Sequence, residues 1–191
     1  RSGRRAGAAS VATLAAASLA APAIARGSKI TLGYVSPQSG PLAAFSEAAQ
    51  YILEAFAASE AGENFEVIVK DSQSNPNRAA EVAKELIIDD EIDLMLVAST
   101  PETTNPVATS CEGEEIPVIS TVAPWQPWFI GQQGNPGDPG SWREFDYAFH
   151  FFWGLEDSIA VFTGMWEQLD TNRSGGAIFP NDGDGNAWGD G

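Results

Sequence analysis

The sequence predicts an α/β fold, a doubly wound parallel sheet flanked by helices. Two features of the chain indicate this class. Short apolar runs of strand length recur along the chain, and segments with apolar residues at helical spacing separate them. Neighbouring parallel strands need a crossover, usually a helix, and helices on both faces make the strands apolar along their length. The alternation therefore favours βαβ units that build one sheet.

The first half of the chain contains three predicted strands. They are residues 29–35 (KITLGYV), 65–70 (FEVIVK) and 94–98 (LMLVA), and the third is apolar enough to be fully buried. Between the first two strands, apolar residues recur at helical spacing from Phe45 to Ala58. This segment is therefore predicted to be the first crossover helix.

A second predicted helix follows the strand at 65–70. Asn75 is a good N-cap residue, and Pro76 suits the first helical turn. The apolar stripe of this helix comprises Ala79, Val82, Ala83, Leu86 and Ile87. We expect this stripe to face the sheet.

The second half of the chain continues the alternation with one interruption. Its predicted segments are a short helix ending near residue 110, a strand at 117–120, a loop at 121–146, a strand at 147–152, a helix at 155–169, and a sixth strand at 176–179 with its exit loop from residue 181. The loop contains Trp125, Trp128 and several glycines and prolines. A loop of this length inside a compact fold is usually functional or disordered.

The first 25 residues have the layout of a secretory signal peptide. Three arginines within the first five residues precede an apolar stretch at 6–20 and a small-residue site ending at Ala25. We expect cleavage before Arg26, while an amphipathic or disordered N-terminal helix is the alternative. No cysteine lies just after the cleavage site, which argues against a lipid anchor there and favours the periplasm. Both general secretory and twin-arginine export remain open.

The chain is strongly acidic, with 26 acidic and 10 basic residues and a formal net charge of −16. Such an excess repels nucleic acid and anionic lipid, so we expect no nucleic-acid partner. It does not by itself indicate a cationic ligand, because a solvated acidic surface is the simpler explanation. The single Cys111 cannot form an internal disulfide, so a packed core must stabilise the fold.

The sequence carries no enzyme motif. It lacks a Gly-x-Ser-x-Gly elbow, a P-loop and a Gly-rich dinucleotide turn. His150 is the only histidine, and its strand context indicates a packed or half-exposed residue rather than a metal ligand. Residues 182–186 imitate the start of a calcium loop, but Ala187 stands where that loop requires glycine. We therefore predict no catalysis, no cofactor and no metal.

Ligands of doubly wound sheets bind outside the carboxyl ends of the strands. Hydroxyl side chains stand there at Ser99, Thr100 and Thr121, where they would suit a carboxylate or another polar group. The alternative is that these hydroxyls cap helices and satisfy the backbone. Trp125 and Trp128 follow the fourth strand and could either wall a ligand pocket or seal the loop onto the domain.

The order of these elements resembles the type I periplasmic binding proteins, and in particular the branched-chain amino acid and amide receptors of the leucine-binding protein type. The resemblance rests on residues 33–42 (GYVSPQSGPL), 71–76 (DSQSNP), 98–100 (AST), 119–121 (IST), 149–157 (FHFFWGLED) and 176–185 (GAIFPNDGDG). It implies two α/β lobes that close on a ligand around a hinge. Residues 26–152 would be the N-terminal ligand-binding lobe. Residues 153–191 would be the hinge-crossing helix and the truncated start of the second lobe, so that the chain is a fragment.

The resemblance also implies a set of ligand-binding residues. By position, the first-lobe contacts would be Gln38, Ser39, Ser99, Thr100, Thr121 and Ala123. Trp125, Phe151 and Asp184 depart from the family pattern near the site and complete the candidate set. The bulk of Trp125 and Phe151 makes a larger or aromatic solute as plausible as a branched-chain amino acid.

The function implied by the resemblance is transport. The protein would be the extracytoplasmic substrate-binding protein of an ABC importer, and would deliver a small polar solute, such as an amino acid or amide, to the permease and ATPase subunits. The alternative is the ligand-sensing domain of a signalling receptor with the same fold. An exported flavodoxin-like or hydrolytic enzyme is the third possibility, and it would need a nucleophile with a base or cofactor-binding turns.

Overall fold

The computed structural model of the protein describes residues 29–190. The predicted signal peptide at residues 1–25 lies outside the described residues. Among residues 29–190, none of the helices has the length and hydropathy that crossing a membrane requires.

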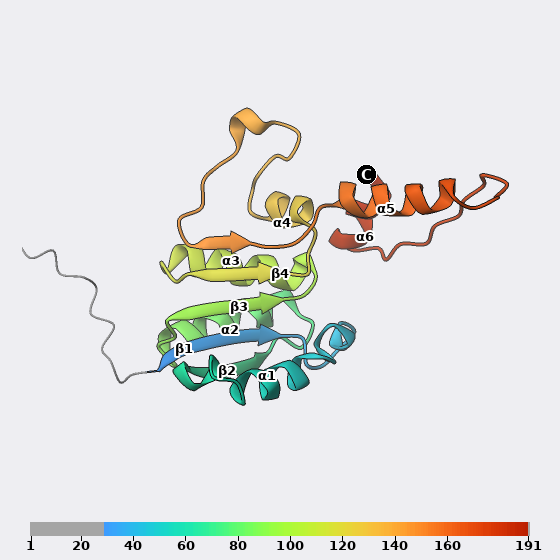
Figure 1. Ribbon diagram of the computed structural model, residues 1–191. Helices are drawn as coiled ribbons and strands as arrows, with labels where there is room; N and C mark the ends of the chain where they lie inside the picture. Colours follow the sequence, from blue (N-terminus) through green and yellow to red (C-terminus); the bar gives the residue numbers. More distant parts are fainter. Residues whose placement is uncertain (1–28, 191) are drawn as a thin grey trace, which may run out of the picture.

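A five-stranded parallel sheet forms the centre of the fold, in the order β2-β1-β3-β4-β5 (Figure 1). The strands are β1 (Ile30–Ser36), β2 (Phe65–Asp71), β3 (Leu94–Ala98), β4 (Val118–Thr121) and β5 (Ala148–His150). The strand order reverses at β1, which pairs with β2 on one side and with β3 on the other. The predicted doubly wound α/β class is therefore confirmed, and the switch point lies between β1 and β3.

Helices connect the strands and cover the sheet. They are α1 (Ala49–Ala57), α2 (Pro76–Ile88), α3 (Pro101–Gly113), α4 (Trp125–Gly131), α5 (Leu155–Glu167) and α6 (Gly183–Asp190), with 3-10 turns η1 (Ala43–Ser46), η2 (Gly62–Asn64) and η3 (Pro139–Ser141). Figure 1 shows α2 and α3 behind the sheet, whereas α5 and α6 lie to one side of it, beyond the carboxyl ends of the strands. The carboxyl ends of the strands therefore point toward the side where the last two helices lie.

The core lies between the sheet and the helices α2, α3 and α4. Met95, Val97 and Val118 of the sheet belong to one buried cluster with the stripe of α2, which is buried as predicted except for the half-buried Ile87. Gly33 allows α2 to approach closely, because a Cβ atom there would lie 3.2 Å from Leu86 Cδ1. Burial of apolar surface on this face is the main stabilising contribution.

The predicted start of α2 is confirmed in detail. Asn75 Oδ1 accepts hydrogen bonds from the backbone N–H groups of Asn77 (2.9 Å) and Arg78 (3.0 Å). Pro76 occupies the first turn, where the missing N–H costs no hydrogen bond. Sequence alone located this helix because its cap and its stripe agree.

Two predictions for single elements are wrong, and a third is right with shorter bounds. β3 is not fully buried, because Leu94, Leu96 and Ala98 face the less covered side of the sheet and are half-buried. The loop predicted at 121–146 contains helix α4, which begins behind Pro124. The strand predicted at 147–152 is confirmed, but pairing shortens it to β5.

The sixth strand predicted at 176–179 does not form. Ile178 is 100% exposed, and this segment pairs with no strand of the described part of the chain. The predicted exit loop is instead helix α6, because Asp182 Oδ1 accepts a hydrogen bond from the backbone N–H of Gly185 at 2.8 Å and caps the first turn.

Candidate functional site

Four segments leave the sheet at the carboxyl ends of β1 to β4 and form what we call the cleft edge. Its members are residues 36–41, 71–75, 99–104 and 121–128. The first two are joined directly, since the backbone N–H of Ser72 donates to the carbonyl oxygen of Ser36 at 3.0 Å. The sheet therefore places the predicted polar residues along one edge, next to the switch point.

Buried hydroxyl groups without a partner mark the centre of the cleft edge. Ser99 and Thr100 are buried, and their side-chain oxygens have no hydrogen-bond partner among the described residues. The same holds for the hydroxyls of Ser36 and Ser72 at the ends of β1 and β2. Unpaired buried hydroxyls are costly, so these four are the candidates for hydrogen bonds to a group outside the described residues.

Thr100 does not cap α3, contrary to the alternative left open by the sequence. It stands at the N-cap position, but its side chain makes no capping hydrogen bond. Thr104 Oγ1 instead donates to the carbonyl oxygen of Ser99 at 3.1 Å. The N-terminus of α3, with its partial positive charge, therefore faces the unpaired hydroxyls of Ser99 and Thr100.

The backbone N–H groups of Gln38 and Ser39 and the hydroxyl proton of Ser39 are already used. The Asp71 carboxylate accepts hydrogen bonds from the backbone N–H groups of Gln38 (2.9 Å) and Ser39 (3.2 Å) and from Ser39 Oγ (2.6 Å). Both residues are exposed at the cleft edge. Sequence analysis missed Asp71, although it is the first residue of the DSQSNP motif.

Thr121 and Ala123 form hydrogen bonds with residues in and just after β5. Thr121 Oγ1 donates to the carbonyl oxygen of Phe151 at 2.7 Å, and the carbonyl oxygen of Ala123 lies 2.8 Å from His150 Nε2. Phe151 itself is 81% exposed. The Thr121 hydroxyl is thus less free than that of Ser99, and a role for these three residues in ligand binding stays a prediction.

Trp125 ties α4 to the start of α5. Its indole N–H donates to Glu156 Oε1 at 2.9 Å, and Gln126 Nε2 donates to Glu156 Oε2. Gln126 Oε1 in turn accepts from the backbone N–H of Leu155 at 2.9 Å. The hydrogen bond from Trp125 lowers the pKa of Glu156 against the opposing effect of burial. Trp125 therefore seals one segment onto another, and Glu156 is a partner that no sequence signal indicated.

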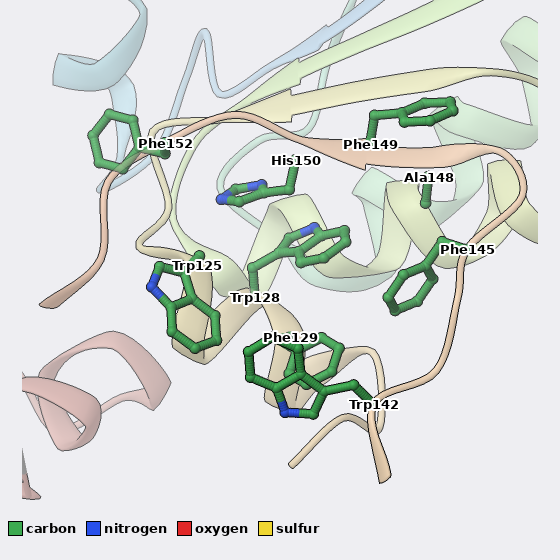
Figure 2. Close-up of a pocket in the computed structure, with 9 residues that line it drawn as sticks. All are labelled: Trp125, Trp128, Phe129, Trp142, Phe145, Ala148, Phe149, His150 and Phe152. Atoms are coloured by element: carbon green, nitrogen blue, oxygen red, sulfur yellow. The ribbon is translucent and has the colours of Figure 1, made fainter. Parts of the chain in front are cut away.

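An aromatic cavity of about 330 Å³ lies between α4, β5 and the loop that joins them (Figure 2). The indole of Trp128 stacks on the imidazole of His150 with ring centroids 4.7 Å apart. Figure 2 also shows Trp142, Phe129 and Phe145 on the far side of Trp128 from His150. The cavity runs along the edge strand β5 rather than over the strand ends, so the residues that line it mainly pack α4 and the following loop against the sheet.

His150 is held in its neutral form. Its Nδ1 lies 2.8 Å from Ser120 Oγ, and its Nε2 lies 2.8 Å from the carbonyl oxygen of Ala123. Since a carbonyl only accepts, Nε2 carries the proton. Burial lowers the pKa of His150, against a smaller opposing effect of the Ala123 carbonyl. The prediction of a packed, half-buried histidine is confirmed.

Asp184 lies against the first turn of α3. Its backbone N–H donates to Glu102 Oε1 at 3.1 Å. Burial, and then the charges of Glu102 and Asp182, raise the pKa of the Asp184 carboxyl. The structure thus brings Asp184 to Glu102 of the cleft edge, two residues after Thr100, while its contact with a ligand stays a prediction.

The described residues offer little for catalysis. No group of three or more His, Cys, Asp or Glu side chains within residues 29–190 could hold a metal ion. Burial raises the pKa of the Cys111 thiol to about 12, so this cysteine is a packed core residue rather than a nucleophile. The arrangement at the cleft edge suits binding, because it supplies hydroxyls and a helix N-terminus.

Comparison with known proteins places this arrangement in a family. The chain matches the family model described as "Periplasmic binding protein" over residues 29–188. No curated protein matches the chain. Its fold is similar to solved structures, and the chain spans less than half the length of each structure described below.

One similar structure is the branched-chain amino acid transporter substrate binding protein LivJ from Streptococcus pneumoniae, in complex with isoleucine. It is 24% identical, with a TM-score of 0.52, over 66% of this chain and 34% of LivJ. Two others are solute binding proteins of ABC transporters from Rhodopseudomonas palustris. The complex with 3,4-dihydroxybenzoic acid is 18% identical over 84% of this chain and 41% of that one, with a TM-score of 0.64. The complex with 4-hydroxybenzoate is 17% identical over 85% and 43%, with a TM-score of 0.59.

Proposed function

Because the chain belongs to the periplasmic binding protein family, we propose that it is the extracytoplasmic substrate-binding protein of an ABC importer. It captures a small polar solute at the cleft edge and delivers it to a membrane permease with its ATPase. Binding agrees with a site that offers hydroxyls and a helix N-terminus. The matching family also supports export to the periplasm, with residues 1–25 as the signal peptide.

The unpaired hydroxyls of Ser99 and Thr100 are the observation that carries this proposal. They are buried at the start of α3, in the part of a doubly wound sheet where ligands bind. A solute carboxylate there would gain hydrogen bonds from both hydroxyls and a favourable interaction with the helix N-terminus. The protein would thereby recover part of the free energy that two unpaired hydroxyls cost.

The solute binds between two lobes in this proposal. Residues 26–152 form the first lobe, and residues 153–191 form the crossing helix and the start of the second lobe. The position of α5 and α6 beyond the strand ends supports this division (Figure 1). The hydrogen bonds from Trp125 and Gln126 to Glu156 tie the first lobe to the beginning of α5, where a hinge would lie.

The solute is an amino acid or an aromatic acid. Relatives with the same fold are described in complexes with isoleucine, 3,4-dihydroxybenzoic acid and 4-hydroxybenzoate. All three compounds carry a carboxylate, which the hydroxyls of Ser99 and Thr100 would hold. The exposed ring of Phe151 gives a planar solute an apolar surface to stack on.

A thermal-shift screen of the full chain tests the proposal. The probes are isoleucine, 4-hydroxybenzoate and 3,4-dihydroxybenzoate, and a solute present at 100 times its Kd adds about 2.7 kcal/mol of stability. Ser99→Ala should abolish a shift that Ser110→Ala, a change in the helix α3 that follows Ser99, leaves intact. A shift that Ser99→Ala does not reduce would place the solute elsewhere. No shift with any small carboxylic acid would refute the assigned solute class.

A further inference from the structure

The carboxylate of Asp71 accepts hydrogen bonds from segment 36–41 of the cleft edge. Its Oδ1 accepts from the backbone N–H groups of Gln38 (2.9 Å), Ser39 (3.2 Å) and Gln73 (2.8 Å), and its Oδ2 accepts from Ser39 Oγ (2.6 Å). Burial opposes ionisation of Asp71, but these hydrogen bonds together hold its pKa below the ordinary value. The carboxylate of Asp71 therefore occupies a nest of three backbone N–H groups, as a bound anion would.

A second tie fixes the same two segments. Ser74 Oγ donates to the carbonyl oxygen of Ser39 at 2.7 Å and accepts from the backbone N–H of Leu42 at 2.9 Å. The approach is close enough to require glycine at position 40, where φ is 86° and a Cβ atom would lie 2.7 Å from Ser74 Oγ. Residues 36–41 and 71–75 thus form one rigid unit rather than two separate loops.

This arrangement sets the polarity of Ser39. A serine hydroxyl has one proton and two lone pairs, and the short contact with Asp71 uses the proton. The backbone N–H groups of Gln38 and Ser39 are used as well. The exposed Ser39 hydroxyl therefore offers lone pairs to the cleft, and the negative charge of Asp71 lies directly behind it.

We propose that Asp71 is the positioning residue of the first cleft segment, 36–41, and that it makes Ser39 a hydrogen-bond acceptor for a donor group of the solute. The inference rests on the proposed function. The donor group is an ammonium or a hydroxyl, whereas the negative charge of Asp71 behind Ser39 disfavours a carboxylate at this hydroxyl. The donor group of the solute therefore lies at a different position in the molecule from the carboxylate that Ser99 and Thr100 would hold.

Amide hydrogen exchange of the full chain without solute tests the positioning. The amides of Gln38, Ser39 and Gln73 should exchange slowly in the wild type and at least about tenfold faster in Asp71→Ala. Asp71→Asn should keep most of this protection, because its remaining oxygen still accepts from the three N–H groups. The matched control is Asp93→Asn, which affects the hydrogen bond that Asp93 accepts from Thr31 N–H (2.8 Å) at the amino ends of β1 and β3. Equal exchange in wild type and Asp71→Ala would overturn the proposal.

Solute pairs that differ by one donor test the polarity of Ser39. The pairs are 4-hydroxybenzoate with benzoate, and isoleucine with 3-methylpentanoate. The wild type and Asp93→Asn should prefer the member with the donor, while Asp71→Asn and Ser39→Ala should lose that preference by about tenfold. An unchanged preference in both variants would refute the assigned role of Ser39. Failure of all probes to bind the wild type would count against the proposed function, and the exchange measurement would still decide the positioning.

Discussion

Replacing Ser99 by alanine should separate binding from stability. The Ser99 hydroxyl is buried and has no partner among the described residues, so its removal deletes no hydrogen bond within the lobe. An unsatisfied buried polar group costs about 1–3 kcal/mol. We therefore expect Ser99→Ala, without solute, to leave the free energy of unfolding unchanged or to raise it by up to about 1 kcal/mol, since the lost methylene-sized volume is small.

Thr104→Val is the matched control, because its hydroxyl is also buried but donates to the carbonyl oxygen of Ser99 at 3.1 Å. Losing that hydrogen bond should cost about 1 kcal/mol, which lowers Tm by about 2–4 °C in a chain of this size. The assay is thermal unfolding of both variants with and without a solute found in the screen. A loss of 1 kcal/mol or more in solute-free Ser99→Ala (roughly the cost of a hydrogen bond) would show that its hydroxyl already has a partner, and the reasoning would fail.

Two further predictions test the core and the buried histidine. Leu86→Ala should destabilise the chain by about 2–5 kcal/mol in chemical unfolding, whereas Ile88→Ala on the same helix, 61% exposed, should change it by less than about 0.5 kcal/mol. Burial lowers the pKa of His150, so the unfolded state binds the proton more readily and stability should fall as the pH drops below 6.5. His150→Gln should flatten this pH dependence between pH 7.5 and 5.5, roughly one pH unit either side of the ordinary imidazole pKa. An unaltered slope would contradict a lowered pKa of His150 in the folded protein.

Local signals were sufficient for the sheet and for α2. The five strands are apolar runs separated by helices, and α2 has a cap at Asn75 and a stripe that includes Leu86, so two independent patterns agreed on one element. The same approach failed for α4 and α6. Glycine and proline around these helices suggested loops, but Asp182 caps α6, and the side chains of Trp128 and Phe129 bury α4 in the core. Tertiary packing outweighed weak helix propensity there.

The sixth strand illustrates a different limit of sequence analysis. Residues 176–179 have the composition of a short strand, yet a strand is stabilised by pairing, and no strand of the described part lies beside this segment. The exposure of Ile178 follows from the same cause. Composition thus indicates what a segment could form, whereas the available partner decides what it does form.

For the candidate site, the rule about strand ends predicted the edge along which the hydroxyls lie but did not distinguish these hydroxyls from one another. Ser39, Ser99 and Thr121 look equivalent in the sequence, since each follows an apolar strand. Their partners differ: Ser39 donates to Asp71, Thr121 donates to the Phe151 carbonyl, and Ser99 has none among the described residues. Those partners are 32 and 30 residues away in the chain, so only the folded arrangement of the strands assigns the proton of each hydroxyl. Under the proposed function, a solute would meet an acceptor at one end of the cleft edge and free donors at its centre, and this asymmetry rather than the residue types would decide which way it binds.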